Sequence, residues 1–388
     1  MSIVSVEKCE NYSSETLTDA LYRTFDNLGG VERFIKPGMK VVLKPNFVMG
    51  KKPEAAATTH PAFIKAVASI VLKAGARVII AESPGGLYTK VALKNVYNLC
   101  GVKSIAEEIK QESGREIELN LDLDSVEVDN QEGKLLKKVT IIKPIADADL
   151  VINLPKLKTH GQMVYTGAVK NLFGTVPGAL KAEYHFRMAQ YDSFADALID
   201  IFLSVKPALN IMDAVWGMEG NGPTAGDPRH IGLILASENA FELDITAINI
   251  IGANPAYIPV MKQAEKRGIC KLDGGEISVK GEKISDVKVE NFNIPQLDAL
   301  RAIEFYDKGI LKHIVKKLKP RPVFNHDACI GCGECARSCP AKIIEMKNKR
   351  PRADLSKCIR CFCCQELCPA KAVKIKRPFF ANFILRNK

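Results

Sequence analysis

The stretch CIGCGECARSCP, residues 329–340, decides the fold of the C-terminal part of the chain. It places four cysteines in the pattern C-x2-C-x2-C-x3-C and follows the last one with a proline. The same pattern returns in CIRCFCCQELCP, residues 358–369. Of the 12 cysteines in the chain, nine lie between Cys329 and Cys368. Because nothing in the sequence indicates export to an oxidising compartment, clustered cysteines of this kind indicate metal ligands rather than disulfides.

The doubled spacing is that of bacterial two-cluster ferredoxins, where three closely spaced thiolates bind one cubane and the fourth binds the other. We expect one 4Fe-4S cluster to be held by Cys329, Cys332, Cys335 and Cys368. We expect the second to be held by Cys339, Cys358, Cys361 and Cys364. Zinc sites are the alternative, but they usually use two separated cysteine pairs. Cys363 falls outside the spacing and is expected not to bind iron.

The stretches that follow the two cysteine runs, AKIIEM and AKAVKI, look like matching short strands. This internal symmetry predicts a small α+β, two-cluster ferredoxin-like domain over residues 320–377. The remaining residues, 378–388, form a tail that mixes basic and apolar side chains. We expect the tail to pack back onto the protein, with a helix lying on a membrane surface as the alternative.

The basic charge of the chain is concentrated at its C-terminal end. The net charge is +11 overall, but residues 312–388 hold 19 Lys and Arg against 5 Asp and Glu. The rest of the chain holds 36 against 39, a balance of −3. Each oxidised cluster with its thiolates carries about two negative charges, which the basic side chains would offset. We therefore expect no nucleic acid as partner, and a redox partner protein or a small-molecule anion instead.

Residues 1–315 alternate strand-like and helix-like segments, which predicts an α/β domain with a mainly parallel sheet flanked by helices. The strand-like segments are short and apolar, and they cover residues 39–47, 77–83, 148–155, 207–215 and 230–237. Helix-like segments cover residues 60–76, 194–205 and 241–252, and the first of them is expected to begin near Thr58 or Thr59. A hairpin is predicted near residues 276–290. No apolar run reaches 18 residues and no signal sequence is evident, which favours a cytoplasmic protein without transmembrane segments.

Ligands of open α/β sheets bind beyond the carboxyl ends of the strands, where this chain has unusual loops. We expect these loops to form a cationic, glycine-rich pocket for an anion such as a carboxylate, phosphate or nucleotide. The candidate ligand-binding residues are Lys44, Asn46, His60, Lys156, Lys158, Asn171, Arg229 and His230. His160 and Lys170 are the candidate catalytic residues, which would bind the anion or shuttle a proton. The alternative for each residue alone is an ordinary solvated lysine or a histidine bonded to the backbone.

The chain resembles the uncharacterised family called domain of unknown function 362, in its form with a C-terminal ferredoxin module. The resemblance is carried by VVLKPNFV, TTHP, LPKLKTHGQMVYTGAVKNLFG and the two cysteine runs. It implies the fold and the iron–sulfur clusters. Part of the third segment also resembles the nickel-pincer lactate racemase family. In that family a histidine precedes by ten residues the lysine that carries the cofactor, and a further histidine ligates the metal; this resemblance points to His160, Lys170 and His185.

Together these features predict an iron–sulfur protein with two 4Fe-4S clusters for electron transfer, coupled to an anionic ligand or cofactor site in the large domain. Such a protein would be an oxidoreductase. One alternative is a dedicated ferredoxin-type electron carrier whose large domain binds a protein partner. Another is an isomerase-like enzyme with a metal or small-molecule cofactor and purely structural clusters.

Overall fold

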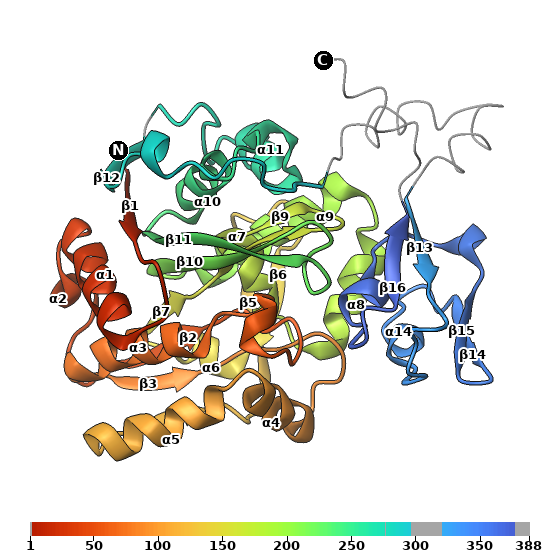
Figure 1. Ribbon diagram of the computed structural model, residues 1–388, viewed down its shortest axis with the longest axis horizontal. Helices are drawn as coiled ribbons and strands as arrows, with labels where there is room; N and C mark the ends of the chain where they lie inside the picture. Colours follow the sequence, from red (N-terminus) through yellow and green to blue (C-terminus); the bar gives the residue numbers. More distant parts are fainter. Residues whose placement is uncertain (1, 276, 296–319, 377–388) are drawn as a thin grey trace.

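The computed structural model describes residues 2–275, 277–295 and 320–376. Within these residues the chain forms a large α/β part and a small C-terminal part, the module (residues 320–376), which lies beside it (Figure 1). The predicted tail 378–388 and residues 316–319, between the two predicted domains, lie outside the described residues. The predicted boundary between the domains therefore stays a prediction.

The large part is built on a ten-stranded sheet with the order β12-β1-β11-β10-β7-β2-β3-β4; off this path, β8 pairs with β10, and β9 pairs with β8. Strands β10, β7, β2, β3 and β4 are parallel to one another, whereas β11 is antiparallel to both of its neighbours. The bounds are β1 Ser2–Lys8, β2 Lys40–Lys44, β3 Arg77–Ile80, β4 Ile117–Leu119, β7 Leu150–Asn153, β8 Lys156–His160, β9 Val164–Thr166, β10 Leu209–Glu219, β11 Asp227–Ser237 and β12 Ile277–Gly281. A separate antiparallel pair joins β5 (Ser125–Asp129) to β6 (Lys138–Ile142). The predicted mainly parallel sheet is confirmed.

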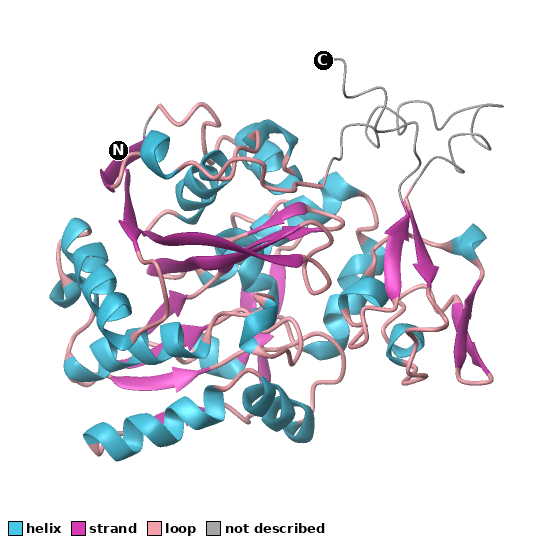
Figure 2. Cartoon of the chain, viewed as in Figure 1, coloured by secondary structure: helices cyan, strands magenta, loops and turns pink. Residues whose placement is uncertain are grey.

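Helices cover both faces of this sheet (Figure 2). Side chains alternate along a buried strand, so Val41 and Leu43 of β2 pack in one core and Val42 packs in the other. The first core includes α1 (Ser14–Asn27), α3 (Pro61–Lys73), α4 (Lys90–Leu99) and α5 (Val102–Ser113). The second includes α7 (Ala168–Asn171), α9 (Tyr191–Val205), α10 (Ala240–Ile250) and α11 (Pro259–Lys266). Three more α-helices lie in the described residues of the large part: α2 (Val31–Phe34), α6 (Lys143–Ala146) and α8 (Gly178–Arg187).

Three local expectations differ from the structure. Helix α3 begins with His60 as its N-cap rather than Thr58 or Thr59, because the His60 side chain accepts a hydrogen bond from the amide of Ala62. The segment near 277–290 forms no hairpin: β12 pairs with β1, and a short 3-10 helix, η4 (Ile284–Val287), follows it. The segment after β7, expected as a loop, is the strand β8, which hydrogen-bonds to β10 and β9.

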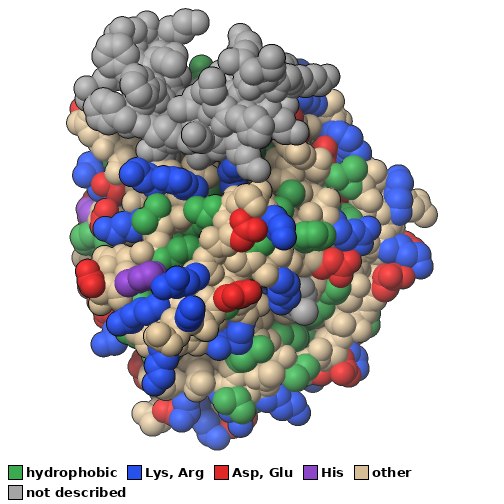
Figure 3. Space-filling model, turned by 90° about the vertical axis from the view of Figure 1, so that its right-hand side faces the viewer, with side chains coloured by type: hydrophobic (Ala, Val, Ile, Leu, Met, Phe, Trp, Pro, Cys, Tyr) green, Lys and Arg blue, Asp and Glu red, His purple; other side chains and the backbone are tan. Residues whose placement is uncertain are grey.

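The module contains two small antiparallel pairs and two short helices. Strand β13 (Arg321–Phe324) pairs with β16 (Val373–Lys376), and β14 (Ile344–Lys347) pairs with β15 (Arg350–Ala353). The helices α14 (Glu334–Arg337) and α15 (Cys363–Glu366) each lie within a cysteine run. The matching strands expected after the two runs are β14 and β16. Lys and Arg side chains are spread over the module's side of the molecule (Figure 3), in keeping with 12 Lys and Arg against 5 Asp and Glu in residues 320–376.

The module packs directly on loops of the large part. Thr224 donates a hydrogen bond to the backbone oxygen of Glu366 at 2.7 Å, and Gln365 donates to that of Asn221 at 2.9 Å. Gly161 permits a close approach of the module, because a Cβ there would lie 2.5 Å from Cδ1 of Ile375. The two parts therefore share a tightly packed contact. In the described residues, no helix is long and apolar enough to cross a membrane.

Candidate functional site

A cavity of about 540 Å³ lies between the large part and the module. Strand β8 contributes Lys158 and His160 to its wall, and α7 contributes Lys170. Helix α8 contributes Lys181 and His185. The module closes the cavity from the other side with Cys339, Cys363 and Glu366, among others. Both candidate catalytic residues predicted from the sequence thus lie on one cavity, together with groups from the module.

The geometry of β8 explains why its polar residues gather. Lys156, Lys158 and His160 occupy alternate positions, so they lie on one face of the strand, while Leu157 packs in the core on the other. All five residues of β8 are buried. The polar side chains of β8 therefore lie in the protein interior rather than in a solvated loop. Each of these buried groups needs a hydrogen-bond partner there.

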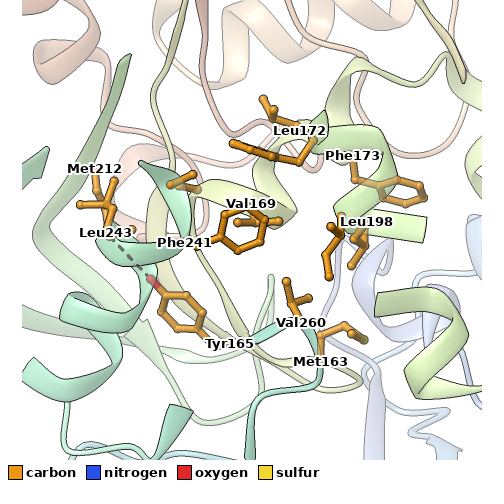
Figure 4. Close-up of a cluster of buried hydrophobic side chains, with 14 of the residues drawn as sticks. Met163, Tyr165, Val169, Leu172, Phe173, Leu198, Met212, Phe241, Leu243 and Val260 are labelled. Carbon is orange, nitrogen blue, oxygen red and sulfur yellow. Dashed lines mark hydrogen bonds between the residues drawn. The ribbon is translucent and has the colours of Figure 1, made fainter. Parts of the chain in front are cut away.

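The first turn of helix α7, which carries Lys170, is hydrogen-bonded to the buried carboxylate of Asp244. Asp244 accepts hydrogen bonds from the amide of Ala168 at 2.7 Å and from that of Val169 at 3.1 Å. Burial raises the pKa of Asp244 to about 7, although these hydrogen bonds favour its ionised form. Val169, and Phe173 beyond the helix, lie in the cluster of buried side chains that includes Phe241 and Leu198 (Figure 4). This packing fixes the position from which Lys170 reaches the cavity.

Lys170 differs from the other lysines of the cavity because it has no polar partner among the described residues. Among the described residues it has no hydrogen bond or ion pair, and its Nζ lies 5.7 Å from the centre of the Phe173 ring. Burial lowers the pKa of Lys170, while Glu366 and Cys363 oppose that change. An ammonium held this way gains most from an anion that enters the cavity.

Lys158 and Lys181 are bound by neutral groups instead of carboxylates. Lys158 donates to Oδ1 of Asn46 at 2.6 Å and to the backbone oxygen of Ala57 at 2.5 Å. Lys181 donates to Oγ of Ser83 at 2.8 Å and also bonds two backbone oxygens. Burial and the nearby charge of Lys170 lower the pKa of Lys158 to about 7, and burial lowers that of Lys181 to about 7. Both side chains therefore change protonation near neutral pH.

His160 and Glu366 form the direct polar contact across the cavity between the two parts. The distance from Nε2 of His160 to Oε1 of Glu366 is 2.9 Å. Nδ1 of His160 accepts from the amides of Gln162 and Met163, at 3.1 and 3.2 Å, so the proton of the neutral ring is on Nε2. Burial and the charge of Lys170 lower the pKa of His160 to about 4. Nε2 of neutral His160 thus lies beside the carboxylate of Glu366, although within the described residues neither atom makes a well-directed hydrogen bond.

Glu366 remains ionised despite its burial. Burial alone would raise its pKa, but His160 and then Lys170 outweigh it and lower the pKa to about 2. The other histidine of the cavity, His185, is held by aromatic packing: its ring centre lies 4.3 Å from that of Phe194. Within the described residues, Nδ1 of His185 is buried without a hydrogen-bond partner. Burial lowers the pKa of His185 to about 3, so it faces the cavity as a neutral ring.

A network of amides and charges supports the floor of the cavity. Lys44 is fully buried and pairs with Glu82 at 2.6 Å, and it also donates to Oδ1 of Asn171 at 3.3 Å. Asn46 donates to the same oxygen of Asn171 at 2.7 Å. Gly174 leaves room for this network, since a Cβ there would lie 1.9 Å from Oε1 of Glu82. Of this group, Asn46, Asn171 and Glu82 line the cavity and Lys44 lies behind them.

Five of the eight candidate ligand-binding residues do not line this cavity: Lys44, which lies behind its wall, and four others. Lys156 pairs with Asp213 at 2.8 Å, and His60 caps α3. Arg229 and His230 lie on β11 at the protein surface and bond backbone oxygens of Glu290 and Glu10. The loops expected to converge therefore do so only in part, because β8 buries Lys156 at a different polar cluster and β11 continues as a strand through residues 227–230.

The eight predicted iron ligands line two small cavities in the module. One is lined by Cys329, Cys332, Cys335 and Cys368, and the other by Cys339, Cys358, Cys361 and Cys364. In the described residues, no three His, Cys, Asp or Glu side chains are grouped closely enough to hold a single metal ion. Cys363 lines the large cavity instead. Cys339 lines both the large cavity and the second cysteine cavity.

Two residues of the site were not singled out from the sequence. Glu366 belongs to the second cysteine run, at the position that Arg337 occupies in the first, and this break in the internal repeat is a signal that could have found it. Lys181 lies on the amphipathic helix α8, where a lysine ordinarily points to solvent. Only the packing of α8 against the loop at Ser83 turns Lys181 inward.

Comparison with known proteins agrees with the two-part structure. A family described as "Domain of unknown function (DUF362)" matches residues 41–249, and a "4Fe-4S dicluster domain" matches residues 321–369. The "Thylakoid-associated protein sll1697" of Synechocystis sp. is 34% identical over 315 residues, which cover 81% of this chain and 93% of that protein.

Two solved structures share a limited likeness with the chain. The lactate racemase apoprotein from Thermoanaerobacterium thermosaccharolyticum has a TM-score of 0.38 and 12% identity, covering 64% of this chain and 58% of that one. A protein from Thermotoga maritima has a TM-score of 0.34 and 11% identity, covering 68% of this chain and 60% of that one. The chain thus spans less than two thirds of either structure.

Proposed function

We propose that this chain, which belongs to the DUF362 family and carries a 4Fe-4S dicluster domain, is an oxidoreductase that moves electrons between two 4Fe-4S clusters and an anion bound in the cavity at the module. The observation that carries the proposal is the position of Cys339, which lines both a four-cysteine cavity and the cavity of Lys170. A ligand there would lie beside a cluster without any intervening layer of protein.

The cysteines fit two cubanes better than single metal ions. Each small cavity is lined by four thiols, in the crossed arrangement in which each run lends its fourth cysteine to the other site. Thiolates around a cubane bind different irons and so stand farther apart than the ligands of one zinc ion. The clusters would supply one-electron transfer, and the surrounding Lys and Arg would partly offset their negative charge.

Within the large part, the proposed roles follow from the hydrogen bonds. Lys170 would pair with the anionic group of the ligand, and Lys158 would assist it. His160 would donate a hydrogen bond from its Nε2–H group to the ligand, because the lone pair on its Nδ1 is occupied by backbone amides. Lys44, Asn46 and Asn171 would hold the floor of the site in place.

The test is anaerobic purification followed by iron analysis and electron paramagnetic resonance of the dithionite-reduced protein. We expect about eight irons per chain, and the same content in Cys363→Ser. Added butyrate, as a simple anionic probe, should change the signal of one cluster and leave the other unchanged. Lys170→Met should abolish that change at full iron content. Zinc in place of iron, or two signals that both ignore butyrate, would contradict the proposal.

One observation favours a second candidate function, an isomerase-like enzyme with a bound cofactor and structural clusters. His160, Lys170 and His185, the residues of the racemase resemblance, all line the cavity. A metal held by side chains alone does not fit, because no three ligating side chains are grouped for it within the described residues. Mass spectrometry of the intact chain distinguishes the two functions, since a cofactor attached to Lys170 would add mass that Lys170→Met lacks.

A further inference from the structure

We propose that the ligand of the cavity is an amphipathic carboxylate, with its carboxylate at Lys170 and an aliphatic or aromatic body that extends to the mouth. This inference rests on the proposed anion site and adds the chemical class of the ligand. Its basis is the division of the cavity wall into a polar interior and an apolar border.

Apolar side chains border the cavity and are exposed to solvent. Leu87, in the loop after β3, has 64% of its surface exposed, and Phe186, near the end of α8, has 54%. A single exposed apolar residue is ordinary. Leu87 and Phe186 border the same cavity, which favours a binding site for an apolar group. Covering each side chain with an apolar part of a ligand would remove apolar surface from water and so favour binding.

The apolar surface continues inward from the mouth. Val48 and Phe173 of the large part and Leu367 of the module also line the cavity. The cavity volume is about 540 Å³. Pockets that enclose drug-sized ligands have volumes of roughly 300–1,000 Å³, so this cavity lies within their range. An acid of two or three carbons would leave most of this apolar wall in contact with water.

The polar interior selects a ligand with one negative charge. Lys170 offers an amine without a polar partner, whose protonated form a bound carboxylate would stabilise, and the buried Nδ1 of His185 also lacks a partner in the described residues. Glu82 and Glu366 line the same cavity, so a group with two negative charges would be repelled where a single carboxylate is tolerated. The wall therefore fits a carboxylate better than a phosphate or a nucleotide.

The experiment is anaerobic titration calorimetry of the full-length holoprotein with butyrate, octanoate, 4-phenylbutyrate, octanol and inorganic phosphate. We expect octanoate or 4-phenylbutyrate to bind at least about tenfold more tightly than butyrate, since each buried methylene contributes up to roughly fourfold. Octanol, which lacks the charge, and phosphate, which lacks the apolar body, should both bind more weakly than octanoate.

Matched variants locate the effect. Phe186→Ser and Leu87→Ser should weaken octanoate binding severalfold and leave butyrate binding unchanged. Val91→Ser is the control, because Val91 is 70% exposed but does not line the cavity. Equal affinity for butyrate and octanoate would overturn this inference and leave the anion site intact. If no carboxylate binds at all, the proposed anion site fails as well.

Discussion

Two groups of buried lysines in the large part differ in what holds them. Lys44 and Lys156 are paired with the carboxylates of Glu82 and Asp213, at 2.6 and 2.8 Å. The other group is Lys158, Lys170 and Lys181, which in the described residues have no carboxylate within ion-pair distance. Burial lowers the pKa of lysines in both groups. The second group lines the cavity, and the first does not.

The difference separates lysines that hold the fold from lysines that are free to bind a ligand. A buried ion pair satisfies both charges, and removing one partner leaves the other charge buried and unpaired. A buried ammonium with only neutral partners keeps an unfavourable energy that a bound anion relieves. The comparison makes four predictions, from the largest expected effect to the smallest.

Lys156→Met should lower the free energy of unfolding by about 3–5 kcal/mol, because Asp213 would remain buried without its cation. Urea unfolding of the holoprotein under anaerobic conditions measures the change. Lys158→Met is the matched control on the same strand and should cost less, about 1–3 kcal/mol, because it leaves only the neutral acceptors Asn46 and Ala57 without a partner. Equal losses in the two variants would mean that the two groups of lysines do not differ.

Lys170→Met should weaken the binding of a carboxylate probe such as octanoate by roughly ten- to a hundredfold, the range of a hydrogen bond to a charged group. Its thermal stability should change little, because no described group loses a hydrogen bond or an ion pair and only the contact of Nζ with the Phe173 ring is removed. Lys94→Met, at an exposed position on α4, serves as the control for the loss of one positive charge. Unchanged affinity for octanoate in Lys170→Met would show that Lys170 does not bind the ligand.

Gly174→Ala should destabilise the large part by about 1–3 kcal/mol, as overpacking of a core does. The new Cβ would lie 1.9 Å from Oε1 of Glu82 and 2.6 Å from Nζ of Lys44, so it would separate this ion pair. Thermal unfolding of the variant measures the cost. Gly275→Ala is a mild comparison, because its Cβ would meet only Asp273, at 3.5 Å. A neutral Gly174→Ala would show that the network tolerates a shift.

Carboxylate binding should strengthen severalfold as the pH falls from 8 to 6. Lys158 and Lys181 have pKa values of about 7, and the protonated amines attract an anion, so affinity is highest below pH 7 and falls as the pH rises through it. The probe itself stays ionised above about pH 5. Calorimetry in buffers of different ionisation heat should show proton uptake on binding at pH 7. Proton release on binding at pH 7 would contradict the prediction that protonation of these lysines strengthens carboxylate binding.

Sequence patterns with a fixed physical meaning gave reliable predictions here. The doubled cysteine spacing predicted the dicluster domain, since three thiolates so close in sequence can bind three irons of one cubane. Alternation of short apolar segments with helical ones predicted the mainly parallel sheet. A helix that connects two parallel strands packs its apolar side on a face of the sheet, and this order of segments allows that arrangement. The iron ligands and the number of clusters remain predictions, although the eight cysteines line two cavities as the spacing predicts.

The tertiary structure decided what the polar residues do, because a residue's role depends on partners distant in sequence. Lys156 and Lys158 are two residues apart on one strand, yet Lys156 meets Asp213 and Lys158 meets Asn46. His60 was a candidate ligand-binding residue because of its side-chain type, but in the structure it is the N-cap of α3. Glu366 lies 206 positions after His160 in the chain, and the two meet only because the module packs on loops of the large part. The sequence alone determined which chemical groups are present, and long-range packing determined which of them face the cavity.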